Sequence, residues 1–220
     1  MLKSGTNMVY EYPENSKAIR LKQHEAALAA AKEDDKLSPE TGKPISKSNM
    51  IKFGVAFLVF GVLWMVGINA IAAFIIPLRL KELVSNPAAV LSINGIVSSI
   101  CSLVANFRTR SKFGGRTPWL IVGSIVGGVF MFLTGIAPNA TLIVIYYGLA
   151  MVGLNIMIAP FVAMLSDRIP KNIRGTMSAC YGAGSTIGGP LGTLLASQLV
   201  NNVTLSSILA GLFMLASGIV

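Results

Sequence analysis

A small set of polar and aromatic side chains interrupts the long apolar stretches of this sequence. The set is Trp64, Asn69, Asn94, Tyr146, Tyr147 and Asn155. Amides and phenols at membrane depth avoid lipid and face a cavity or another helix, which makes them candidates for solute contacts. The flat indole of Trp64 can stack on a sugar ring or an aromatic drug. For each residue the alternative is an interhelical hydrogen bond or plain packing.

No catalytic or metal-binding pattern accompanies these residues. The single histidine, His24, lies in the polar first 52 residues, and Cys101 and Cys180 lie in separate apolar stretches without ligand spacing. A nucleophile with its base, a metal-ligand cluster or a phosphate-binding loop would each need partners that the sequence does not place together. We therefore expect no enzyme activity, no metal and no cofactor.

The spacing of charges indicates the elements that position the polar groups. After residue 52, every charged residue falls in one of three short patches, and 53% of the chain is hydrophobic. A bilayer core of roughly 30 Å is crossed by about 20 helical residues. The sequence thus predicts an all-α membrane protein with six spans. They cover residues 53–78, 86–107, 118–137, 141–166, 176–200 and 204–220.

The first 52 residues form a polar segment that carries both acidic and basic side chains. We expect one helix over residues 16–35 in a cytoplasmic, solvated and partly disordered tail. The pI of about 9.8 reflects cations in this tail and in the loops, and it predicts topology rather than a nucleic-acid partner.

The loop cations also predict the orientation of the chain. Two connectors are basic, around Lys112 and around Lys171, whereas those at Asn139 and Asn202 carry no charge. Basic loops stay on the cytoplasmic side, so both basic connectors and the amino terminus are expected inside. The expected location is a multi-pass position in the plasma membrane.

The two basic loops resemble a known family. Residues 106–119 read NFRTRSKFGGRTPW and residues 160–175 read PFVAMLSDRIPKNIRG. Both are similar to the cytoplasmic loop motifs of the major facilitator superfamily, in its glycoside and cation symporter-like branch. The resemblance implies the amino-terminal six-helix half of a transporter, with these loops as a cytoplasmic gate. The matching residues are Arg108, Arg110, Lys112, Gly114, Arg116, Asp167, Arg168, Arg174 and Gly175. The alternative is that the loops only determine topology.

The fifth predicted span contains a glycine repeat. Gly184, Gly188 and Gly192 recur every four residues beside Pro190, a pattern that favours close helix packing. It also faintly resembles the fifth-helix motif of drug–proton antiporters.

The family resemblance implies transport of a small solute, such as a sugar or glycoside, by alternating access. Efflux of drugs or other amphipaths is the alternative, and a truncated, non-transporting membrane remnant is a third possibility from another class. The predicted spans hold no acid, cation or histidine that could couple an ion. The last span is short, which predicts truncation. The expected partners are the solute, the lipid bilayer, and a missing carboxy-terminal half or a second copy.

Overall fold

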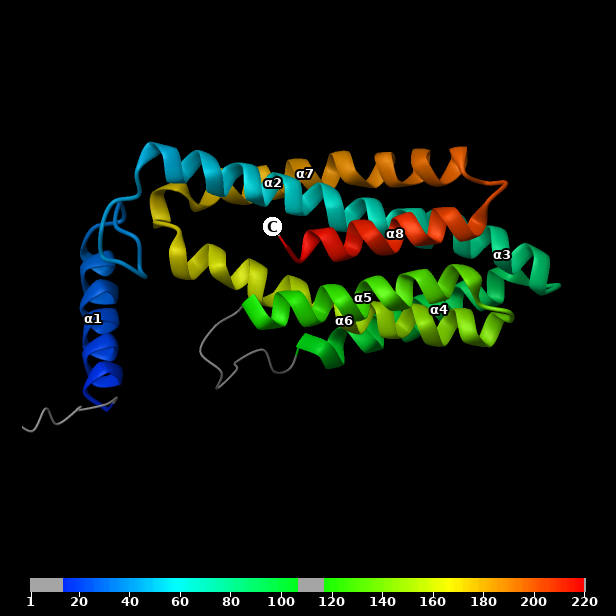
Figure 1. The fold of residues 1–220 in the computed structure, drawn as a ribbon, viewed down its shortest axis with the longest axis horizontal. Coiled ribbons are helices and arrows are strands. Elements are labelled where there is room, and N and C mark those ends of the chain that lie inside the picture. The colour runs from blue at the N-terminus through cyan, green and yellow to red at the C-terminus, as the bar shows by residue number, and fades with distance from the viewer. Residues whose placement is uncertain (1–13, 107–116, 220) are drawn as a thin grey trace, which may run out of the picture.

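The computed structural model describes residues 14–106 and 117–219, and these residues form an all-α chain (Figure 1). The helices are α1 (Glu14–Glu33), α2 (Lys47–Asn69), the π-helix η1 (Ala70–Ile75), α3 (Ile76–Leu83), α4 (Pro87–Asn106), α5 (Thr117–Ile136), α6 (Ala140–Arg168), α7 (Lys171–Gln198) and α8 (Val203–Ser217). The long helices lie side by side in one bundle, and α1 stands across one end of it.

Three helical segments are long and apolar enough to cross a membrane. They are the 37-residue run Lys47–Leu83, which joins α2, η1 and α3, the 20-residue α5, and the 29-residue α6. The part of α4 over Pro87–Cys101 and helix α8 are apolar but shorter. Helix α7 has 28 residues, with glycine, serine and threonine at many positions where the other helices carry larger apolar side chains. An all-helical chain suited to a membrane is confirmed, whereas the count of six spans remains a prediction.

The first long helix exceeds its predicted bounds at both ends. It begins at Lys47, where the Ser46 hydroxyl accepts a hydrogen bond from the Asn49 amide at 3.3 Å, and it continues through Pro77 to Leu83. Pro77 does not end this helix. It is tolerated because it falls in the first turn of α3, directly after η1, where amides have no partner within their own helix.

The segment that follows α1 also differs from the expected solvated tail. Ser38 is only 3% exposed, and its hydroxyl donates to the backbone oxygen of Arg168 at 2.7 Å. Two ion pairs, Asp35–Lys171 and Glu40–Arg168, also join this segment to the bundle. Their members are far apart in the sequence, so the pattern of charges along the chain does not identify them as partners.

The helices pack as two similar groups of three. Helix α2 packs chiefly on α7 and α8, helix α6 packs chiefly on α4 and α5, and α5 packs on α8. Exchanging α2 with α6, α4 with α7 and α5 with α8 leaves this pattern unchanged. Helices α2 and α6 run in opposite directions along the bundle, so the two groups are inverted relative to each other (Figure 1).

Stacked rings and close backbone contacts hold the two groups together. The ring of Phe60 on α2 stacks on Phe161 of α6, with centroids 3.6 Å apart. Between α5 and α8, a Cβ added to Gly128 would come within 2.8 Å of the backbone oxygen of Gly211. Helices that meet this closely need small residues at the crossing.

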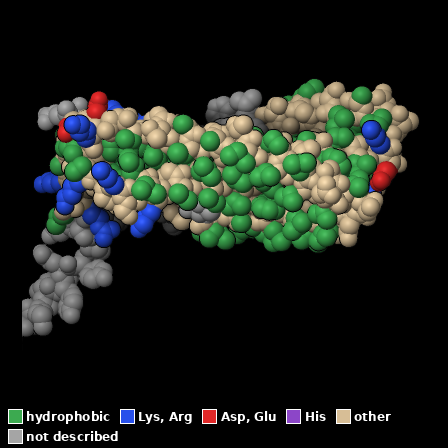
Figure 2. All heavy atoms as spheres, turned by 90° about the horizontal axis from the view of Figure 1, so that it is seen from above, with side chains coloured by type: hydrophobic (Ala, Val, Ile, Leu, Met, Phe, Trp, Pro, Cys, Tyr) green, Lys and Arg blue, Asp and Glu red, His purple; other side chains and the backbone are tan. Residues whose placement is uncertain are grey.

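The surface in Figure 2 matches this arrangement. Charged side chains gather at the two ends of the bundle, and the face between them shows hydrophobic side chains without charge. Such a band is expected of a surface in contact with lipid.

Candidate functional site

The candidate site lies where α2 faces α7. The rings of Trp64 on α2 and Tyr181 on α7 stack at a centroid distance of 6.4 Å and an angle of 15°. Phe161 of α6 adds a third ring, 5.9 Å from Tyr181. One wall of this site is therefore aromatic.

Polar atoms accompany the rings. The Tyr181 hydroxyl lies beside the side chains of Ser185 and Trp64. Nevertheless, Trp64 Nε1 and Ser185 Oγ are buried without any partner that meets hydrogen-bond geometry. A buried donor that is left unsatisfied costs roughly 1–3 kcal/mol, so two of them in one place need an explanation. The Tyr181 hydroxyl is the acceptor that the structure places beside both, and a bound molecule with acceptor oxygens would be an alternative partner.

Sequence reasoning missed Tyr181 and Ser185 as site residues. They are spaced by four residues on α7, which places them on the same helical face. This spacing could have predicted a polar face on the helix, but the sequence analysis considered only the glycine repeat that lies beside it. Only the structure shows that Trp64 of α2 is the residue that faces Tyr181.

The two amides on the central helices make equivalent local bonds. Asn69 Nδ2 donates to the backbone oxygen of Met65 at 3.0 Å, and Asn155 Nδ2 donates to that of Met151 at 2.8 Å. A Cβ added to Gly189 would lie 3.7 Å from Asn69 Nδ2, so this amide faces α7. Helices α2 and α6 hold equivalent positions in the two inverted groups. Each carries an asparagine whose side chain donates a hydrogen bond to the backbone of its own helix.

Asn94 is the third predicted amide, and it lies on α4. Its side chain is buried, and its Oδ1 atom has no hydrogen-bond partner. Helix α4 packs chiefly on α6, so the structure does not bring Asn94 together with Trp64 and Ser185.

The predicted tyrosines belong to the core instead. Tyr147 is buried among apolar core residues, and Tyr146 packs against that core, with its ring 6.1 Å from Phe130 of α5. These contacts favour plain packing for both tyrosines.

The predicted gate residues divide between described and undescribed parts of the chain. Arg108, Arg110, Lys112, Gly114 and Arg116 lie outside the described residues. Asp167, Arg168, Arg174 and Gly175 lie at the corner between α6 and α7.

The cations of the α6–α7 corner bind the tail and the backbone. Arg174 donates through Nε to the oxygen of Ile169 at 2.9 Å and through Nη2 to that of Ser166 at 2.6 Å. It thereby caps the carboxy-terminal end of α6. Arg168 pairs with Glu40 of the tail, at 3.0 Å from Nε to Oε2. Asp167 accepts a hydrogen bond from the Ser166 hydroxyl at 3.3 Å.

The glycine repeat of α7 lies directly against α2. A Cβ added to Gly184, Gly188 or Gly192 would collide with the backbone oxygen of Leu58, Val62 or Val66, respectively. The backbones of α2 and α7 can approach this closely only because these positions have no side chain. Pro190 lies inside α7 on an exposed side of the helix.

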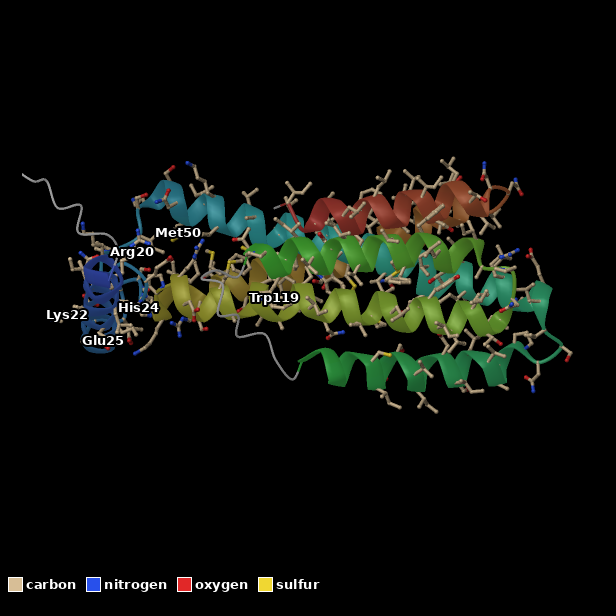
Figure 3. The ribbon with its side chains drawn as sticks, turned by 60° about the horizontal axis from the view of Figure 1, so that its bottom comes forward. Arg20, Lys22, His24, Glu25, Met50 and Trp119 are labelled. Atoms are coloured by element: carbon tan, nitrogen blue, oxygen red, sulfur yellow. The ribbon has the colours of Figure 1, made fainter. Side chains whose placement is uncertain are left out.

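The described residues contain no group of three or more His, Cys, Asp or Glu side chains that could hold a metal ion. His24 lies on α1, at the end of the bundle and away from the aromatic wall (Figure 3). The site thus offers stacking and hydrogen bonding rather than acid–base chemistry. No protein-family model matches this sequence, and no curated protein or solved structure matches it either.

Proposed function

We propose that this chain forms one wall of a solute pathway across a membrane, as the amino-terminal half of a transporter of the major facilitator superfamily. The inverted packing of its two three-helix groups is the observation that carries the proposal. Six-helix halves of such transporters are built from three-helix repeats of opposite orientation, with the substrate site near the middle of the bilayer. The loop motifs of the sequence point to the same family.

The proposed solute is a sugar or glycoside. Such a molecule has an apolar ring face that can stack on Trp64 and hydroxyl oxygens that can accept from Trp64 Nε1 and Ser185 Oγ. Binding would replace the missing partners of both buried donors.

The second wall of the pathway would come from another six-helix unit, either in a longer polypeptide or in a second copy of this chain. Alternating access moves one such unit against the other around a fixed site. The predicted spans contain no Asp, Glu, Lys, Arg or His, so we propose that the solute moves through this wall without an embedded ion-coupling group.

The proposed orientation can be tested with introduced cysteines. In a background with Cys101 and Cys180 replaced by serine, a cysteine at Asn139 or Asn202 should react with an impermeant maleimide added to intact cells. A cysteine at Lys171 should react only after permeabilisation, because basic loops remain inside. If only Lys171→Cys were labelled in intact cells, the orientation would be the reverse of the one proposed.

The transport proposal is tested by reconstituting the purified chain into liposomes and measuring uptake of a panel of labelled sugars, glycosides and one cationic dye. Saturable uptake of a sugar or glycoside is the expected result if two copies of this chain assemble and supply both walls of the pathway. Saturable uptake of only the dye would favour amphipath efflux. Leak-level flux across the panel, with the protein correctly inserted, would favour the non-transporting remnant.

A further inference from the structure

The segment between α1 and α2 is a folded loop. Within residues 34–44, Ser38 N donates to the oxygen of Lys43 at 3.0 Å and Gly42 N donates to that of Ser38 at 2.8 Å. Gly42 has a φ of 63°, a left-handed conformation that side chains disfavour. Its backbone packs on Ala27 of α1. The loop therefore has a defined shape of its own, and we call residues 34–44 the strap.

The strap is bound to the α6–α7 corner by four contacts. Two are ion pairs, Asp35–Lys171 at 2.9 Å and Glu40–Arg168 at 3.0 Å. Two are hydrogen bonds, from the Ser38 hydroxyl to the oxygen of Arg168 at 2.7 Å and from the Asn172 amide to the oxygen of Asp35 at 3.3 Å. Both strap acids meet cations of the corner, so the charges of the two surfaces are complementary.

The buried and exposed contacts have different roles. The charged side chains are about half exposed, which makes each ion pair weak and sensitive to salt. Ser38 and Pro39 are buried, and the Ser38 hydroxyl bonds the corner, so this part of the strap defines where the strap sits. Asn172 lies in the first turn of α7, where an amide has no partner within its own helix, so its bond depends on the strap.

The strap binds Arg168, which also lines an apolar cleft between α2 and α6. This cleft has a volume of about 130 Å³ and is lined by Phe53, Ala56, Phe57, Phe161, Met164, Arg168 and Ile169. Arg168 thus belongs both to the cleft and to the strap contact. Arg20, His24 and Met50 are labelled in Figure 3 and mark α1 and the start of α2 at this same end of the bundle.

The corner needs this support because α6 and α7 pack mainly on other helices. Helix α6 packs on α4 and α5, and α7 packs on α2, with little contact between α6 and α7 themselves. The strap continues into α2 at Ser46, so it ties the start of α2 to the end of α6 and the start of α7.

We propose that the strap is a regulatory device that holds these three helix ends together and keeps the α2–α6 cleft closed. Loss of its two ion pairs releases the strap, exposes the Asn172 amide and opens the cleft. Raised ionic strength acts in the same direction, since screening weakens exposed ion pairs. The inference rests on contacts within the described chain and does not require transport.

Hydrogen exchange of the purified full chain in detergent tests the release. In the double variant Asp35→Asn/Glu40→Gln, exchange of the Asn172 amide and of the strap amides should be about tenfold faster than in the wild type. The matched control is Glu25→Gln on α1, an exposed acid outside the strap. It should leave these rates unchanged.

A charge swap separates specific pairing from general damage. Asp35→Lys alone should speed exchange at Asn172, and adding Lys171→Asp should restore slow exchange. A cysteine at Ala56, in a background lacking Cys101 and Cys180, reports the cleft, and its alkylation should accelerate about tenfold in the double variant. Equal exchange in the double variant and Glu25→Gln, no rescue by the swap, or unchanged alkylation at Ala56 would each overturn the proposal.

Discussion

Replacing Gly188 with leucine should abolish the folded bundle. A Cβ at this position meets the backbone oxygen of Val62 and the side chain of Met65, and backbone atoms cannot yield as a flexible side chain can. The leucine would force α7 away from α2, its principal neighbour. We expect a loss of stability of more than about 4 kcal/mol, seen as aggregation in size-exclusion chromatography and loss of the thermal transition.

Gly182 provides the matched control on the same helix. A Cβ there meets nothing within 4 Å, and the residue is exposed. Gly182→Leu should therefore change the stability by no more than about 0.5 kcal/mol. Similar melting temperatures for Gly188→Leu and Gly182→Leu would show that α7 does not pack on α2 through this glycine face.

Removing both unsatisfied donors should greatly reduce solute uptake. The double variant Trp64→Phe/Ser185→Ala keeps an aromatic ring at residue 64 but removes the indole N–H and the hydroxyl. Each hydrogen bond to a solute contributes about 0.5–1.5 kcal/mol, so kcat/KM should fall about tenfold or more. The measurement is initial uptake by proteoliposomes of the solute identified in the panel.

Stability separates this functional role from plain packing. Without solute the two buried donors meet only the Tyr181 hydroxyl, outside good hydrogen-bond geometry, so removing both should change the melting temperature little. Thr186→Ala is the matched control, since its exposed hydroxyl donates to the oxygen of Gly182 at 2.9 Å outside the aromatic wall. If the double variant transports as well as Thr186→Ala, the two donors do not contact solute.

The sequence predicted those features that depend on local composition. Charge-free apolar stretches predicted helices near their observed positions, and the spacing of Gly184, Gly188 and Gly192 indicated the face on which α7 meets α2. The continuation of the first long helix beyond residue 78 was not predicted. It depends on the π-helical segment η1, which has no simple sequence signature.

Features that depend on long-range contacts could not be predicted. The pairing of Asp35 with Lys171 joins residues 136 positions apart, and nothing in the local sequence marks these two charges as partners. The role of Tyr181 depends on Trp64 across the α2–α7 contact. Tyr147 shows the reverse case: its polar tip suggested a cavity, but the structure buries it in the core.

Counterflow in proteoliposomes tests the central claim most directly. Vesicles are loaded with a high concentration of unlabelled solute, and a trace of labelled solute is added outside. A carrier that alternates its access should accumulate label transiently above equilibrium. The site carries unlabelled solute outward, releases it outside and then takes up labelled solute for the return. We predict this overshoot for the wild-type chain, with a second copy supplying the other wall, and its absence in Trp64→Phe/Ser185→Ala. A monotonic approach to equilibrium by the wild type, at the rate of protein-free vesicles, would contradict the account.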